Sequence, residues 1–241
     1  MTRLRLLLVL AVAAVAAVAL PGTGRAGGEC TGVPDCISVP GPWVAVPAHG
    51  EANYLLECPG RSGIVGGLDA PVTSQKVEVT FDGLIASPVV SGHTTTTFAF
   101  FRAVSANGRP GAFQPRIGCI PQKAQAVDTA WRPDLRTRRF AASARVVPLG
   151  APLDLRAAKL VLRPGKVQAA AIGCPTGEHL VSGWDATVFD TADPPDLSLA
   201  GLVHVRRTSA NGKVKVTVET SRALPAAAKA SVQVGAACAG P

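Results

Sequence analysis

The hexapeptide YLLECP at residues 54–59 has a counterpart, AAIGCP, at residues 170–175, which lies 116 positions later in the chain. Three more pairs keep nearly the same spacing: GGLDA at 66–70 with SGWDA at 182–186, FDGLI at 81–85 with LAGLV at 199–203, and Cys119 with Cys238. Only three residues of gap therefore accumulate along the whole match. Internal repetition of this length predicts two copies of one module.

Alternation of apolar and polar residues indicates that both copies are built from β-strands. Residues 213–219 read KVKVTVE, and this period of two places three valines on one face and the polar residues on the other. Val77 and Val79 alternate with polar neighbours in the same way. At an offset of 118, the three valines of residues 213–219 match Thr96, Phe98 and Phe100, which are therefore predicted to point inward as well. At the same offset, Val79 and Phe81 match Leu197 and Leu199, which predicts a second pair of matching strands.

Phe101 has a special place in this alignment. It matches Glu219 and is therefore predicted to lie on the face opposite Phe98 and Phe100. An apolar residue where the other copy carries a charge indicates an interface between the modules or a binding patch.

Each copy is predicted to contain about six short strands separated by Gly, Pro and Asn turns. In the first copy they lie near 43–46, 53–58, 63–68, 76–85, 95–104 and 113–119. Such strands are typical of a sandwich or barrel, so we expect an all-β chain with two tandem, disulfide-stapled β-sandwich modules. The predicted parts are a signal peptide at 1–26, a first module at 27–121, a basic linker at 122–145 and a second module at 146–241. A pairing strand is also considered at 140–147, and a short helix at 223–230.

The pattern of Cys-Pro, then Gly-Gly, then a distant Cys resembles small secreted bacterial β-sandwich repeat modules of undefined function. The spacing from Cys58 to Cys119 is also similar to that of immunoglobulin-like domains, in which one disulfide joins two sheets. The tryptophan and tyrosine that mark immunoglobulin domains are missing, because no Trp or Tyr lies between these cysteines. The resemblance implies an immunoglobulin-like form of the sandwich and no catalytic residues.

The N-terminus has the pattern of a secretory signal. Arg3 and Arg5 precede an apolar run at residues 6–20, and small residues at Gly24 and Ala26 suit cleavage before Gly27. A spanning helix needs about 20 apolar residues, so retention of this segment as an anchor is the less favoured alternative. We therefore expect a secreted, extracytoplasmic protein that does not interact with a membrane after cleavage.

Six cysteines follow the predicted signal, and an even count in an exported chain indicates a disulfide framework. They are Cys30, Cys36, Cys58, Cys119, Cys174 and Cys238. A bond that predates the duplication must occur once in each copy, which predicts Cys58–Cys119 and Cys174–Cys238. Cys30 and Cys36 are then left to pair with each other.

Composition excludes several classes of protein. Hydrophobic residues make up 47% of the 241 residues and charged residues only 17%, which is atypical of a disordered chain. The formal charge is +8, and it falls to +5 when the three arginines of residues 1–26 are removed. The arginines between 132 and 145 could meet an anionic polymer, but only two aromatic residues accompany them, so we expect no nucleic-acid partner.

Few residues are candidates for catalysis or metal binding. Asp69 and Asp185 are interpreted as turn carboxylates, and His49 and His93 as turn residues that tolerate positive φ. His179 and His204 could join a Ser-His-Asp triad, although no Gly-x-Ser-x-Gly motif is present. Asp190, Asp193 and Asp196 do not match a calcium loop, and neither a zinc motif nor a nucleotide fingerprint occurs. We therefore assign no catalytic residue, no metal and no cofactor.

The sequence favours a non-catalytic exported protein that binds a surface, a polymer or another protein, or that has a structural role. An extracellular hydrolase or a protease inhibitor is the alternative. The ligand is not encoded in any motif.

Overall fold

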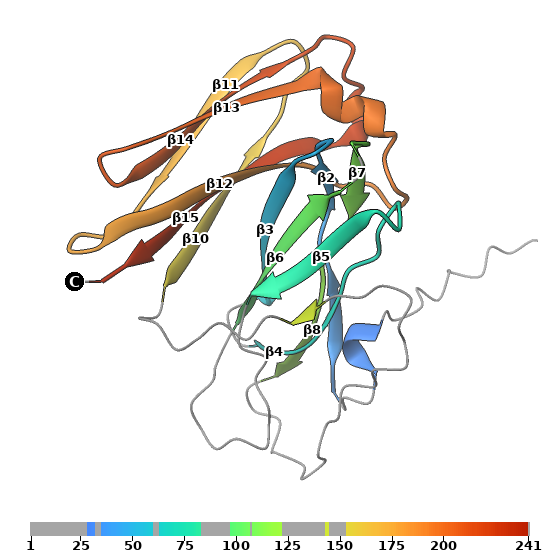
Figure 1. Ribbon diagram of the computed structural model, residues 1–241, viewed down its shortest axis with the longest axis vertical. Coiled ribbons are helices and arrows are strands. Elements are labelled where there is room, and N and C mark those ends of the chain that lie inside the picture. The colour runs from blue at the N-terminus through green and yellow to red at the C-terminus, as the bar shows by residue number, and fades with distance from the viewer. Residues whose placement is uncertain are drawn as a thin grey trace, which may run out of the picture.

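The computed structural model describes residues 28–31, 35–59, 63–82, 97–106, 108–121, 143–144 and 153–240, and its architecture is all-β (Figure 1). The elements before residue 122 are η1 Gly28–Cys30, β1 Ile37–Pro40, β2 Trp43–Val46, β3 Glu51–Glu57, β4 Gly63–Asp69, β5 Val77–Asp82, β6 Phe98–Ser105, β7 Gly111–Phe113 and β8 Arg116–Pro121. The later elements are β9 Ser143–Ala144, β10 Asp154–Val161, β11 Val167–Gly173, β12 His179–Phe189, η3 Leu197–Leu202, β13 Val203–Ala210, β14 Lys213–Thr220, η4 Ala226–Ala228 and β15 Ala230–Ala239. The all-β fold class predicted from the sequence is confirmed.

The strands form sheets with the orders β1-β8-β4, β3-β6-β5-β9, β10-β15-β12-β2-β7 and β11-β14-β13. Pairing is antiparallel except between β5 and β9. The orders β1-β8-β4 and β3-β6-β5 before residue 122 are matched by β10-β15-β12 and β11-β14-β13 after it. The segments 28–121 and 153–240 are called the first and second halves below.

The core of the second half follows the strand alternation. Val214, Val216 and Val218 are fully buried, and they lie in one cluster with Val232, Val234 and other apolar residues of β15. The prediction that the valines of residues 213–219 point inward is therefore confirmed. Asn211 and Gly212 both have positive φ and form the tight turn between β13 and β14.

In the first half, the predicted orientation of β6 is wrong. Its buried residues are Ala99, Phe101, Ala103 and Ser105, and Phe101 lies in the first half's core with a ring centroid 6.3 Å from that of Phe113. Phe98 and Phe100 lie on the other face, where they pack against the second half. The interface between the halves that was expected at Phe101 is thus formed by Phe98 and Phe100. Val77 and Val79 are buried, as predicted.

The two halves are joined by paired strands and by a packed interface. The end of β12 pairs with β2, placing Val188 beside Val44. Behind this junction, the ring of Trp184 meets that of Phe100 edge-on, with centroids 4.8 Å apart. The Gln233 side chain bonds both backbone groups of Leu55, accepting from its N–H at 2.8 Å and donating to its carbonyl at 2.9 Å. Side-chain packing and buried hydrogen bonds therefore fix the first half against the second.

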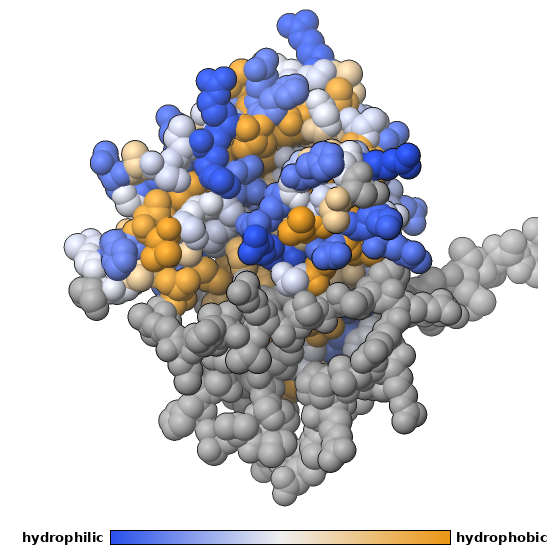
Figure 2. Space-filling model, viewed as in Figure 1, coloured by the Kyte–Doolittle hydropathy of each residue, from blue (hydrophilic) through white to orange (hydrophobic). Residues whose placement is uncertain are grey.

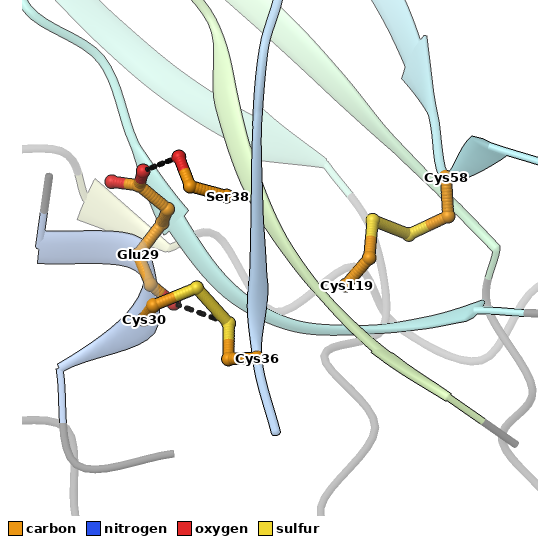
Figure 3. Close-up of a disulfide and its surroundings, with 6 residues drawn as sticks. All are labelled: Glu29, Cys30, Cys36, Ser38, Cys58 and Cys119. Atoms are coloured by element: carbon orange, nitrogen blue, oxygen red, sulfur yellow. Dashed lines mark hydrogen bonds between the residues drawn. A yellow bond between two sulfur atoms is a disulfide. The ribbon is translucent and has the colours of Figure 1, made fainter. Parts of the chain in front are cut away.

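Three disulfides are present, Cys30–Cys36, Cys58–Cys119 and Cys174–Cys238, and they join the pairs expected from the repeat. Figure 3 shows the first two, with the Cys30–Cys36 bond beside η1 and Cys58–Cys119 joining the chain after β3 to β8. Disulfides of this kind are typical of extracytoplasmic proteins.

Three local predictions differ from the structure. The strand expected near 113–119 is divided, since β7 ends at Phe113, β8 begins at Arg116, and Pro115 between them has no N–H to donate. The segment containing Leu197 and Leu199 was expected to be a strand, but it is the 3₁₀ helix η3, which is capped by the Asp196 carboxylate bonded to the Ser198 N–H. The apolar residues at 197, 199 and 202 suit either structure, and this cap favours the helix. At 223–230 the helical part is limited to η4, which begins after Pro225.

Several predicted features lie outside the described residues. They are the signal peptide at 1–26, His93, Thr96, residues 83–85 and 95–96 of two predicted strands, and the linker at 122–145 except for β9. β9 lies within 140–147, the segment where a pairing strand was considered, and it pairs parallel to β5. No helix among the described residues is long and apolar enough to cross a membrane.

Candidate functional site

The outer face of the sheet β11-β14-β13 carries an exposed group of basic residues. The alternation that buries the valines of β14 turns Lys213 and Lys215 to the outside, and the antiparallel register places Arg206 of β13 in the next row, beside Thr217. These residues, together with His204, Thr208 and Glu219, are called the basic face. Figure 2 shows hydrophilic residues interspersed with hydrophobic ones over the upper part of the molecule.

The cations of the basic face have no acidic partner within the described part of the chain. Arg207, which points to the other side of β13, pairs with Asp185 at 2.9 Å, and Lys159 of β10 pairs with Asp190 at 2.6 Å. No such ion pair involves Arg206, Lys213 or Lys215 among the described residues. Residues two apart on one strand are separated by about 6.7 Å, so Lys213 and Lys215 place two positive charges close together on one side of β14.

An open depression of about 530 Å³ adjoins one end of the basic face. It lies between the turn that precedes β12 and the β13–β14 hairpin, and its lining includes Glu178, His179, Ser209 and Asn211. Oε2 of Glu178 is shielded from solvent and has no hydrogen-bond partner in the described structure. The side chains of His179, Ser209 and Asn211 also line the depression and carry donors and acceptors suited to a hydroxyl-rich ligand.

The depression is lined by His179, which the sequence analysis considered for a triad, and by a serine, Ser209, which it did not name. No hydrogen bond links His179 to Ser209 or Glu178 among the described residues. His204 lies elsewhere, on the basic face beside Glu219. The contact between a nucleophile and its base is not formed in this arrangement.

The two aspartates predicted to lie in turns have different places. Asp69 ends β4, and its carboxylate accepts a 2.9 Å hydrogen bond from the Ala70 N–H, as a turn carboxylate does. Asp185 lies in the middle of β12, so its turn assignment is wrong. Burial raises the pKa of Asp185, and the Arg207 guanidinium opposes part of this rise. Asp185 therefore forms an ion pair with Arg207 and does not act as a turn carboxylate.

His49 has a φ of +52°, which confirms its turn role. The acidic residues after β12 are dispersed: Asp190 pairs with Lys159, Asp196 caps η3, and Asp193 is exposed. Within the described ranges, no group of three His, Cys, Asp or Glu residues is arranged to hold a metal ion.

Sequence reasoning did not identify the basic face. The pattern KVKVTVE indicated its lysines, but Arg206 joins them only through the register of β13 with β14. No protein family matches this chain, and no curated protein is significantly similar to it.

Proposed function

We propose that this chain is an exported, non-catalytic binding protein, and that its basic face binds an acidic polysaccharide. The observation that carries the proposal is the pair of Lys213 and Lys215 with Arg206 beside it, exposed and without acidic partners in the described structure. A polymer with regularly spaced carboxylates satisfies several of these cations at once. The adjoining depression supports a sugar, because its polar groups suit hydroxyls.

Other polyanions fit the basic face less well. Its residues include no Phe, Tyr or Trp, whereas single-stranded nucleic acids are held largely by base stacking on aromatic side chains. Export, which the signal sequence and the disulfides support, also favours an extracellular polymer. The internal duplication is part of this proposal, and the repeated strand order of the two halves supports it.

The test is calorimetric titration of the mature chain with polygalacturonate, with neutral dextran as a reference ligand. A triple variant, Arg206→Gln, Lys213→Gln and Lys215→Gln, removes three charges from the basic face. A matched triple variant, Arg156→Gln, Lys159→Gln and Arg163→Gln, removes the same charge from β10 and its following turn.

We expect the first variant to bind polygalacturonate at least tenfold more weakly and with a smaller dependence on salt concentration. The matched variant and the unmodified chain should bind alike, and dextran should bind to neither. Equal weakening in both variants would show that net charge rather than this face is responsible, and it would refute the proposal.

An extracellular hydrolase is the second candidate, because the depression holds His179, Ser209 and Glu178 together. It predicts ester hydrolysis that is lost in Ser209→Ala and His179→Ala. Ester turnover unchanged in both variants would exclude this site.

A further inference from the structure

Glu29 is a carboxylate buried at the start of the described chain. The residue is only 1% exposed. Its Oε1 accepts a hydrogen bond from the Ser38 hydroxyl, while its Oε2 is shielded from solvent and has no hydrogen-bond partner in the described structure (Figure 3). A buried carboxylate oxygen without a donor is unfavourable, which indicates that a donor belongs at this position.

The sheet beneath Glu29 is shaped to receive this segment. Gly67 of β4 and Gly118 of β8 are register partners, and Ser38 of β1 lies on the other side of Gly118. A Cβ atom added at either glycine would collide with the backbone carbonyl of Glu29. The row of Ser38, Gly118 and Gly67 therefore forms a cradle in which the Glu29 backbone lies directly on the sheet.

The Cys30–Cys36 disulfide holds the segment in this cradle. Sγ of Cys36 lies 3.9 Å from the Glu29 carbonyl oxygen, a packing contact because a disulfide sulfur carries no proton. The disulfide thus limits how far Glu29 can move from the sheet, and its carboxylate stays buried.

The matching row in the second half is also covered by packed residues. Gly118 precedes Cys119, and Ala237 likewise precedes Cys238 on β15. Ala237 and its neighbour Leu155 are covered by Leu55 and Phe100 of the first half. The first half has the Glu29 segment in the corresponding place, so its docking protects an otherwise uncovered sheet face.

The missing donor can be identified from the expected processing of the chain. The signal sequence predicts cleavage after Ala26, and this would create an α-ammonium group on Gly27, two residues before Glu29. A primary ammonium carries three donors and the charge that a carboxylate requires. We infer that the Glu29 cradle is an ammonium-binding site, and that its ligand is the chain's own N-terminus produced by signal removal.

This inference rests on the export that forms part of the proposed function, but it is independent of the basic face and of any polysaccharide. It predicts that the N-terminal segment reaches its full stability only after cleavage. The same site would lose this contribution if residues remained in front of Gly27, because the ammonium would then lie elsewhere.

The experiment is a double-mutant cycle on purified, oxidised protein. One chain begins at Gly27, and the other carries Gly24, Arg25 and Ala26 in front of it. Each is made with Glu29 and with Glu29→Gln, and urea unfolding is measured at pH 6. We expect the extension to raise the unfolding equilibrium constant about tenfold when Glu29 is present and to have no effect in Glu29→Gln.

The pH dependence gives a second readout. An ammonium bound by a carboxylate has a raised pKa, so its stabilisation is complete below the usual α-amino value of about 7.7–8.0 and is lost as pH rises through the raised value. The difference between the two Glu29 chains should therefore vanish at high pH. An extension effect of equal size in both Glu29 and Glu29→Gln, no effect in either, or a difference that persists at high pH would overturn the inference.

Discussion

The Gln233 side chain offers a quantitative test of how the halves are held together. We consider Gln233→Met, which keeps the length of the side chain and prevents water from entering, but removes the hydrogen bonds. The Leu55 N–H and carbonyl then lose their partners in an interface where Leu55 is only 3% exposed. A weaker 3.4 Å bond from the Trp184 indole to Gln233 is lost as well.

The expected magnitude follows from the two backbone groups. A buried polar group left unpaired costs roughly 1–3 kcal/mol, so Gln233→Met should lower the free energy of unfolding by about 2–6 kcal/mol. Gln168 provides a matched control, because its side chain also bonds two backbone groups, accepting from Arg163 N–H at 2.7 Å and donating to Val161 O at 3.0 Å. Both of these bonds are exposed, so water replaces them and the change should be about 1 kcal/mol or less.

The assay is equilibrium urea unfolding under non-reducing conditions, followed by tryptophan fluorescence. Gln233→Met should be at least about 1 kcal/mol less stable than Gln168→Met. Two variants within about 0.5 kcal/mol of each other would refute the reasoning that Gln233 satisfies buried groups at the interface.

Three further outcomes are expected. Cys174→Ser should lower the free energy of unfolding by about 4 kcal/mol and Cys30→Ser by only about 2 kcal/mol, because their bonds span 64 and 6 residues; calorimetry of each variant checks this order. Asp185→Asn should be more stable than the unmodified chain at pH 7. Burial raises the folded-state pKa of Asp185, so stability from its neutral form is complete below the unfolded value of 3.8 and is lost as pH rises through the folded value. Unfolding curves should therefore converge below pH 3, and a constant difference would contradict this account. N-terminal sequencing of exported protein should begin near Gly27, and a sequence beginning at Met1 would contradict signal removal.

The sequence predicted the class of fold, most strand positions and the disulfide pairs, because these depend on alternation and on the repeated cysteines. It failed on β6, where Phe98, Ala99, Phe100 and Phe101 are all apolar. One face of this strand meets the core and the other meets the second half, so alternation carries no signal of orientation. The strand register gives the orientation. Phe101 pairs with Tyr54, and Val216 pairs with the matching residue Ala170, so Phe101 matches the buried Val216 and not Glu219.

The candidate sites were less predictable for a related reason. Lys213 and Lys215 can be identified from one strand, but Arg206 joins them only because β13 pairs with β14 in a particular register. Glu29 gave no signal at all, since a carboxylate near a chain start is usually exposed. Its burial depends on two glycines, Gly67 and Gly118, that are distant in sequence.

The pairing of β12 with β2 has a consequence for the behaviour of the protein at high concentration. Unpaired strand edges are templates for aggregation, and this junction covers the end of the β12 edge, where Val188 and Phe189 pair with β2. The sheet then ends at β7, which has only three residues, and at β10, which carries Asp154, Arg156 and Lys159. Short or charged edges resist pairing with another chain. The junction that joins the halves therefore also limits edge-to-edge association with another chain where β12 meets β2.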